Sequence, residues 1–176
     1  MSALAPVLRW LLPAALVLGA CSPALNWRQA PLGALSFSLP CKPDKAQRAV
    51  SLAGRNVTLE MQGCEARGAL FAISRAQVGD ATAIPAVVQA WRASALAALR
   101  TDEGVATVLA APRYGRVPGL ASAVWLGVAG QRPQGGVVQA QLAWLVLGGD
   151  VYHLAVYAAP LGPDMTEPFF TDITLP

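Results

Sequence analysis

The stretch "GGVVQAQLAWLVLGGDVYHLAVYAA", residues 135–159, decides the fold, because two long apolar runs flank a glycine turn. Gly148, Gly149 and Asp150 form the turn signal, since glycine adopts the positive φ angles that a tight hairpin demands. We therefore predict two long antiparallel strands joined at this point. Both runs become apolar at successive positions near the turn, so we expect a helix or a partner to cover part of the second face of this sheet.

Shorter strand signals precede the hairpin. Residues 33–39 alternate between apolar and polar side chains, the pattern of a half-buried strand, and Pro40 ends them. Residues 49–64 predict two short strands about a turn at Gly54, Arg55 and Asn56. The remaining candidates are strands at 68–78 and 104–111, a short helix at 163–172 and an extended end at 173–176.

One long amphipathic helix is predicted between the two groups of strands, from Ile84 to Arg100. Asp80 or Thr82 can cap it, and Pro85 suits a first turn, where no amide donor is needed. Its apolar residues recur at spacings of three and four: Ile84, Val87, Val88, Trp91, Ala95, Leu96 and Leu99. We interpret Trp91 as part of the core rather than as a ligand-stacking residue. The predicted fold class is α+β, a mostly antiparallel sheet with one main amphipathic helix.

The start of the chain has a different character. An apolar run from Trp10 to Ala20 is about half as long as a helix that crosses a bilayer. With Arg9 before it and small residues after it, the run is typical of a secretory signal peptide. At its end, Leu18-Gly19-Ala20-Cys21 resembles the lipobox of bacterial lipoproteins.

The lipobox resemblance implies that Cys21 becomes the lipidated first residue of the mature protein. Several acyl chains, each contributing about 0.8 kcal/mol per buried methylene, would then anchor it in a membrane. Ser22 follows, and by the sorting rule of Gram-negative lipoproteins this implies the periplasmic face of the outer membrane. The alternatives are an uncleaved signal anchor in the inner membrane and an ordinary cleaved secretory signal.

The predicted organisation has three parts: a lipoprotein signal peptide at 1–20, a tether at 21–32 without periodicity, and a single α/β domain at 33–176. Removal of the signal peptide leaves 156 residues, enough for one self-sufficient core. It also removes Arg9, which leaves 12 Lys and Arg against 10 Asp and Glu. Because the basic residues are scattered along the sequence, we expect no nucleic-acid partner.

Two cysteines remain in the domain, Cys41 and Cys64. The only histidine is His153, so the four closely paired ligands of a structural zinc site are missing from the sequence, and no metal is predicted. An oxidising compartment and an even count favour a disulfide between them. Closing a loop of this length should stabilise the fold by about 3 kcal/mol. The alternative is two buried free thiols.

Signals for catalysis are weak, and we predict neither a catalytic residue nor a cofactor. His153 lies next to the turn that contains Asp150, so a general base with a carboxylate partner is conceivable, but a second catalytic group is missing. Among the loops, "RYGRVPG", residues 113–119, holds Arg113, Tyr114 and Arg116. These three residues are our candidate binding site for an anionic or glycan surface, because arginine forks favour carboxylates and phosphates.

The order of elements adds a second resemblance. "FSLP", a short basic segment, a hairpin about a glycine, a cysteine strand, one long helix, "GGDVYHLAV" and a terminal "EPFFTDITL" resemble small bacterial envelope proteins. Their fold is thought to be similar to the PsbP-like α/β sandwich, an antiparallel sheet flanked by helices. The resemblance covers about residues 35–175. It implies a role in assembly or stabilisation, which transfers by association only.

The function expected from all these signals is that of a membrane-anchored periplasmic lipoprotein. It would act as a non-enzymatic binding or assembly module of the cell envelope, attached to the membrane by its lipid and facing an envelope protein or cell-wall partner. The alternatives are a small ligand-binding protein or hydrolase that uses His153, and an inner-membrane protein with an uncleaved signal anchor.

Overall fold

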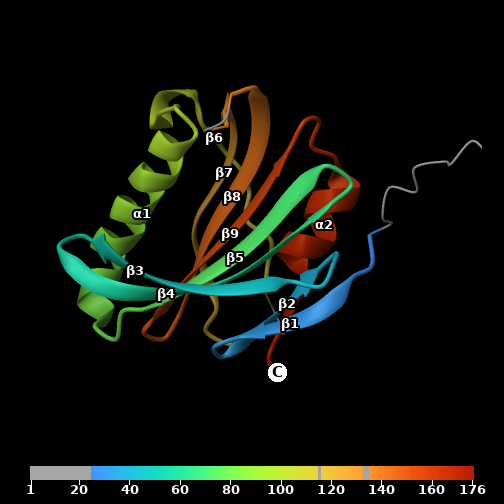
Figure 1. The fold of residues 1–176 in the computed structure, drawn as a ribbon. Helices are drawn as coiled ribbons and strands as arrows, with labels where there is room; N and C mark the ends of the chain where they lie inside the picture. Colours follow the sequence, from blue (N-terminus) through green and yellow to red (C-terminus); the bar gives the residue numbers. More distant parts are fainter. Residues whose placement is uncertain (1–24, 115, 133–134) are drawn as a thin grey trace, which may run out of the picture.

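The computed structural model describes residues 25–114, 116–132 and 135–176. Within them, ten strands form one sheet of seven strands and one of three, and two α-helices flank the larger sheet (Figure 1). The predicted α+β class is therefore confirmed. The larger sheet has the order β3-β4-β5-β9-β8-β7-β6 and the smaller one β1-β2-β10, and all paired strands are antiparallel.

The element bounds, in chain order, are β1 Arg28–Leu32, β2 Leu35–Leu39, β3 Asp44–Leu52, β4 Arg55–Ala66, β5 Ala69–Gln77, a 3₁₀ turn Ala81–Ala83, α1 Ile84–Ala98, a second 3₁₀ turn Glu103–Val105, β6 Thr107–Val108, β7 Ala121–Gln131, β8 Val137–Leu147, β9 Asp150–Ala158, α2 Pro163–Thr171 and β10 Ile173–Thr174.

The predicted hairpin forms the centre of the larger sheet. Leu147 pairs with Asp150, so the turn contains only Gly148 and Gly149. Gly148 has a φ of 57°, in the left-handed region that glycine enters at little cost. Asp150, predicted as part of the turn, is instead the first residue of β9.

Both faces of this hairpin are covered, as its composition predicted. Val138, Leu142 and Trp144 of β8 pack in the cluster under α1, whereas Ala143 and Leu145 pack in the cluster under α2 and the three-stranded sheet. The molecule therefore has three layers: α1, the seven-stranded sheet, and a layer made of α2 with β1, β2 and β10 (Figure 1). We call the two sides of the central sheet the α1 face and the α2 face.

Helix α1 begins at the predicted residue but ends at Ala98, two residues early. Arg100, with a φ of 52°, is in the left-handed conformation that terminates helices. Asp80 caps the preceding 3₁₀ turn through its bond from the Thr82 amide and not α1 itself. Trp91 is 6% exposed inside the core, as interpreted from its spacing.

The tether prediction is wrong over its last residues. Arg28–Leu32 forms β1, which pairs with β2 along its whole length and buries Ala30 and Leu32. Pro31 obscured this strand in the sequence, because proline cannot donate to a sheet ladder. It is tolerated here because β1 is an edge strand. The carbonyl of Pro31 accepts a hydrogen bond of 2.7 Å from Gln62 Nε2.

Two further boundaries differ from the predictions. The first hairpin turns at Ala53 and Gly54, both with positive φ, rather than at Gly54 to Asn56, and its strands are longer than predicted. The strand predicted at 104–111 shrinks to Thr107–Val108. The short helix and extended end predicted for the last residues are confirmed as α2 and β10.

The predicted disulfide is present. Cys41 and Cys64 are joined, with their Cα atoms 6.0 Å apart. Cys41 follows β2 and Cys64 lies in β4, so the bond connects the segment leaving the small sheet with the large sheet. It restrains the attachment of the α2-side layer.

The residues that carry the lipobox lie outside the described part of the chain. The signal peptide at 1–20, lipidation at Cys21 and the sorting role of Ser22 therefore stay predictions. In the part that is described, neither helix has the length and apolar character needed to span a bilayer.

Candidate functional site

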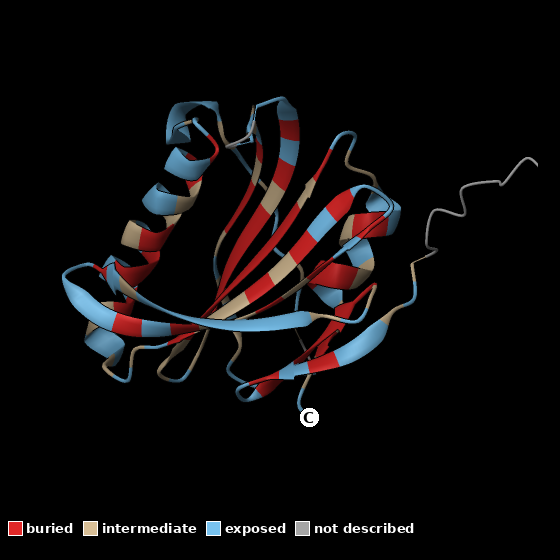
Figure 2. Cartoon of the chain, in the orientation of Figure 1, coloured by how far each residue is buried: buried red, intermediate tan, exposed pale blue. Residues whose placement is uncertain are grey.

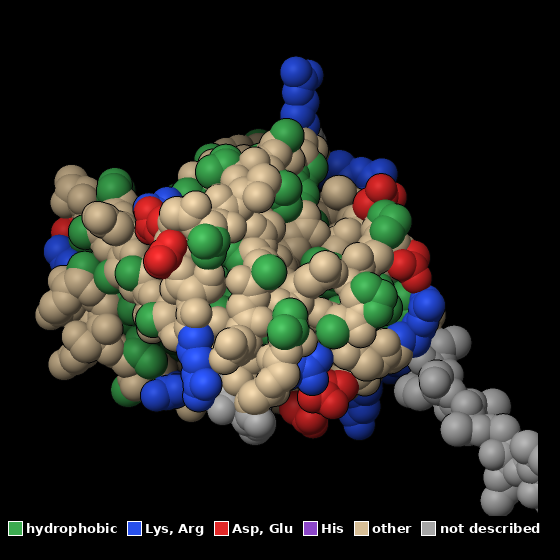
Figure 3. All heavy atoms as spheres, turned by 90° about the horizontal axis from the view of Figure 1, so that it is seen from above, with side chains coloured by type: hydrophobic (Ala, Val, Ile, Leu, Met, Phe, Trp, Pro, Cys, Tyr) green, Lys and Arg blue, Asp and Glu red, His purple; other side chains and the backbone are tan. Residues whose placement is uncertain are grey.

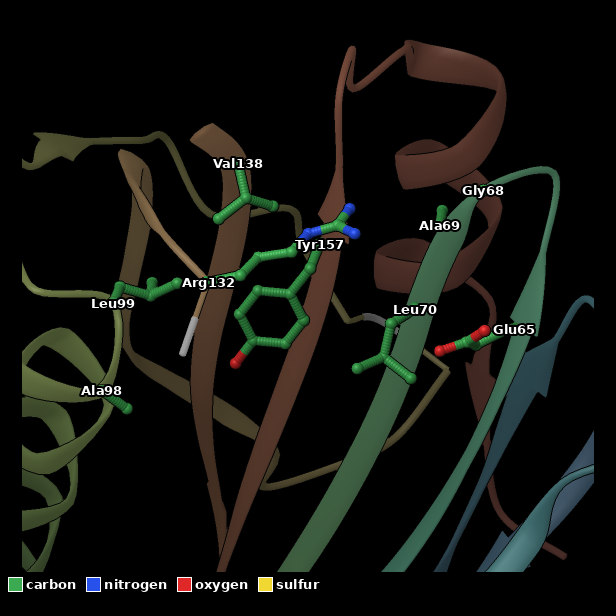
Figure 4. Close-up of a pocket in the computed structure, with 9 residues that line it drawn as sticks. All are labelled: Glu65, Gly68, Ala69, Leu70, Ala98, Leu99, Arg132, Val138 and Tyr157. Carbon is green, nitrogen blue, oxygen red and sulfur yellow. The ribbon is translucent and has the colours of Figure 1, made fainter. Parts of the chain in front are cut away.

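A cleft of about 550 Å³ lies on the α1 face, between the C-terminal end of α1 and the seven-stranded sheet (Figure 4). Ala98 and Leu99 form the helix side. Leu70 of β5 and Tyr157 of β9 lie opposite each other in register and project to the same side of the sheet (Figure 4). The remaining lining residues are Val138, Ala69, Gly68, Glu65 and Arg132.

The cleft exists because α1 leaves part of the sheet uncovered. In β5, Phe71 and Ile73 face the α2 side and are fully buried. The alternate residues Ala72 and Ser74 are only half-buried, and Leu70 is 39% exposed. Figure 2 shows this change of burial along β5. A strand whose apolar side chain faces open space at a cavity is a natural wall for an apolar ligand.

Two polar groups of the cleft have no partner among the described residues. Burial raises the pKa of the Tyr157 hydroxyl to about 12, so it stays protonated and remains a hydrogen-bond donor. The exposed guanidinium of Arg132 makes no ion pair with a described residue. In Figure 4 its side chain extends toward the strand of Tyr157. The mouth of the cleft thus offers one cation and one neutral donor.

Glu65 stands on the opposite side of the mouth. It pairs with Leu70, which pairs with Tyr157, so Glu65 and Tyr157 are two strand spacings apart, about 10 Å. The cleft therefore has a basic end and an acidic end with apolar side chains between them. Such an arrangement matches the shape and polarity of an apolar body that carries one charged group.

His153 is buried on the α1 face, 7% exposed, and does not line the cleft. Its ring stacks on Trp144 at 4.5 Å between centroids and lies 5.4 Å from Trp91. Burial lowers its pKa to about 3, and no described residue forms a hydrogen bond with its Nε2. The conceivable pairing with Asp150 does not form, because that carboxylate points to the α2 face and binds Arg75.

The loop candidates Arg113, Tyr114 and Arg116 are not brought together as a binding surface. Tyr114 packs against the α2-side core, and its hydroxyl is buried without a partner. Burial also raises its pKa to about 12. Arg113 is exposed, and Arg116 Nη1 lies 4.0 Å from Asp172 Oδ1. With the aromatic ring turned inward, the loop presents only two exposed cations.

A polar network on the α2 face was not predicted from the sequence. Arg75 Nε donates to Asp150 Oδ2 at 2.8 Å and its Nη1 donates to Glu60 Oε2 at 3.1 Å. These acceptors hold the pKa of Arg75 above its ordinary value. Tyr152 donates to the same Asp150 oxygen at 3.3 Å and accepts from the Ala34 amide at 3.2 Å. The network fastens the β1–β2 turn to the large sheet, so we assign it a structural role.

A second network closes the small sheet. Ser38 Oγ donates a short hydrogen bond to Asp172 Oδ2, and Gln29 Nε2 donates to the same oxygen at 3.1 Å. Ser36 Oγ donates to Gln29 Oε1 at 2.9 Å. No histidine accompanies this serine–aspartate pair, because the only one lies on the other face of the sheet. The residues join β1 and β2 to the end of α2.

Charges on the surface are dispersed. In the view of Figure 3, Lys and Arg side chains stand at separate places around the rim, with acidic side chains among them. Among the described residues, no three His, Cys, Asp or Glu side chains are grouped closely enough to hold a metal ion. The absence of a nucleic-acid partner and of a cofactor stays a prediction.

Comparison with known proteins adds no relative to this picture. No family model matches the chain, and no curated protein is similar to it. The interpretation of the cleft therefore depends on its geometry alone.

Proposed function

We propose that the chain is a lipoprotein of the bacterial cell envelope, anchored through Cys21 at the periplasmic face of the outer membrane, which acts as a non-enzymatic binding module. The observation that carries the binding role is the cleft under α1. Its walls are apolar, and Tyr157 and Arg132, two polar groups without a partner among the described residues, line it. Such a combination is the usual form of a ligand site.

The state of the reactive side chains supports a role without catalysis. His153 is enclosed by two tryptophans, and its low pKa keeps it neutral at physiological pH. The carboxylates of Asp150 and Glu60 are engaged by Arg75. A hydrolase needs a base within reach of a nucleophile, and none of His153, Asp150 and Glu60 lines the cleft. The PsbP-like assignment and an envelope protein or cell-wall partner remain part of this proposal.

The first experiment tests the anchor. The full chain is expressed in a Gram-negative host beside Cys21→Ser, and intact mass is measured on separated inner and outer membranes. We expect loss of residues 1–20, the added mass of diacylglyceryl and acyl groups, and recovery in the outer membrane for wild type only. A full-length unmodified chain in the inner membrane would overturn the lipoprotein proposal in favour of a signal anchor.

The second experiment tests whether His153 has a chemical role. His153→Phe keeps an aromatic ring between the two tryptophans and removes both nitrogens. We expect it to complement any phenotype of a deletion strain as fully as wild type does. If a folded His153→Phe variant fails to complement, the hydrolase alternative gains the support that the geometry does not give it.

A further inference from the structure

The cleft under α1 has chemistry selective enough to name the class of its ligand. We propose that it binds a single-chain amphiphile with one anionic head, of the fatty-acid type, with the chain on the sheet and the head at Arg132. This inference rests on the binding role proposed above and specifies its ligand.

The walls favour an apolar chain. Leu70, 39% exposed, is one of the few large apolar side chains left open to solvent, and it lies beside Tyr157 in register. Leu99 and Val138 complete the apolar enclosure from the helix and from β8. The lining extends over β4, β5, β9 and β8, three strand spacings or about 14 Å, so an elongated ligand fits better than a compact one. Covering Leu70 would remove exposed apolar surface from water.

The floor disfavours a peptide. β5 pairs with β4 and β9, and β9 pairs with β5 and β8, so the backbone groups under the cleft are already used within the sheet. A peptide held there would lose water from its own amides without gaining partners, whereas an acyl chain has no polar group to satisfy. The same reason argues against a strand from a second copy at this place.

The mouth selects the head group. Arg132 has no ion pair among the described residues, and the Tyr157 hydroxyl, kept protonated by burial, has no acceptor there. A carboxylate or phosphate accepts hydrogen bonds from the guanidinium, whereas the Tyr157 hydroxyl points away from Arg132, toward the side of α1 (Figure 4). Glu65 at the far side of the mouth repels a second anionic group, so the ligand carries one head and lies with it toward Arg132.

The test uses the full chain, purified and placed in lipid nanodiscs, and a lauric acid analogue that carries a photoreactive diazirine in its chain. After illumination, labelled peptides are located by mass spectrometry. A probe with the same chain and a trimethylammonium head serves as the charge control. We expect the carboxylate probe to label peptides from 68–77 and 150–158, and the cationic probe to label them roughly tenfold less, the factor for about 1.4 kcal/mol.

Three variants test which residues of the cleft determine the labelling. Leu70→Trp narrows the cleft and should lower the label there, and Arg132→Glu should lower labelling by the carboxylate probe roughly tenfold. Tyr157→Phe keeps the shape of the wall and should label as wild type does, because the hydroxyl points away from Arg132. Arg48→Glu makes the same charge change on the exposed strand β3, away from the cleft, and should label as wild type does.

Labelling of the cleft that is equal for both probes, or unchanged in Arg132→Glu, overturns the anionic amphiphile. A phosphate-headed probe that labels the cleft while the carboxylate probe does not assigns the site to a lipid phosphate instead of a fatty acid. If the chain is lipidated at Cys21 but its labelling does not depend on the head group, the proposed ligand is refuted and the proposed lipid anchor stands. If the chain is not lipidated but is labelled as expected, the proposed lipid anchor is refuted and the proposed ligand stands.

Discussion

The two faces of the central sheet are closed in different ways. On the α2 face, β1, β2, β10 and α2 cover a core that includes the fully buried Phe37, Phe71 and Phe169, and the layer is fastened by the disulfide and the Arg75 network. On the α1 face, one helix covers the sheet and leaves the cleft at its end. The difference suggests a division of work: the α2 face holds the fold together, and the α1 face has space for a ligand.

The difference between the two faces should be largest when one apolar side chain is removed from each. Phe169→Ala removes a fully buried ring that lies 5.5 Å from Phe71 and 5.0 Å from Phe170, so the free energy of unfolding should fall by about 3–5 kcal/mol. Leu70→Ala, at a side chain that is 39% exposed, should lower it by less than about 1 kcal/mol. Urea unfolding measures both, and equal losses would contradict the division between the faces.

The disulfide should have the next largest effect, because it restrains the layer on the α2 face. Replacing Cys41 and Cys64 together by alanine should lower the free energy of unfolding by about 3 kcal/mol. Urea unfolding of wild type with and without a reductant should give a similar difference. The double variant is the control, since a reductant should leave its stability unchanged. A wild type insensitive to reduction would show that packing alone holds this layer.

His153 should make the α1 face sensitive to acid. Its pKa is about 3 in the folded protein, because burial disfavours the charged ring, against an ordinary value of 6.5. Between these values the unfolded chain binds a proton that the folded chain does not. Above pH 6.5 this group therefore does not lower the free energy of unfolding. As the pH is lowered from 6.5 toward 3, the free energy of unfolding falls by about 1.4 kcal/mol per pH unit.

His153→Phe removes the imidazole that binds this proton in the unfolded chain. The difference in stability between variant and wild type should grow in favour of the variant as the pH is lowered from 7 to 4, measured by urea unfolding at each pH. At pH 7.5 the variant should be as stable as wild type or more so, because the buried Nε2 without a partner is gone. A difference that does not depend on pH would show that the ring is solvated in the folded protein.

The smallest effect is expected at the hydroxyl of Tyr157. No described residue accepts a hydrogen bond from it, so Tyr157→Phe should change the free energy of unfolding by less than about 0.5 kcal/mol in the absence of ligand. Thermal and urea unfolding of the ligand-free protein measure this. A loss above about 1 kcal/mol would mean that the hydroxyl has a structural partner and is not kept for a ligand.

The strands, the helix and the disulfide could be predicted because their signals are local. Alternation at 33–39, the glycine turn of the hairpin and the three-and-four spacing of Trp91 and its neighbours follow from backbone geometry, which acts over a few residues. The errors also have local causes. Pro31 hid an edge strand, and Ala53 took a positive φ beside Gly54 that its own side chain does not favour.

The candidate site was missed because its residues are adjacent only after folding. Leu70, Tyr157 and Arg132 come from separate segments, and none of them carries a motif. The loop residue Tyr114 was favoured instead, since its two neighbouring arginines are visible in the sequence, but its ring turns into the core. The one signal in the sequence was that the large apolar Leu70 shares a face of its predicted strand with the small residues Ala72 and Ser74. This signal is weak without the strand register.

The α+β class, the hairpin and the long helix follow from the amino-acid sequence, because periodicity and turn chemistry act within short stretches. The disulfide was predicted because Cys41 and Cys64 are the two cysteines of the predicted domain. Only the tertiary structure decided which face stays open and which polar groups remain without partners. Arg75 and Arg132 look alike in the sequence, yet the first meets two carboxylates and the second faces a cleft. That outcome depends on strand order and register, which bring distant residues together and are not written in any one segment.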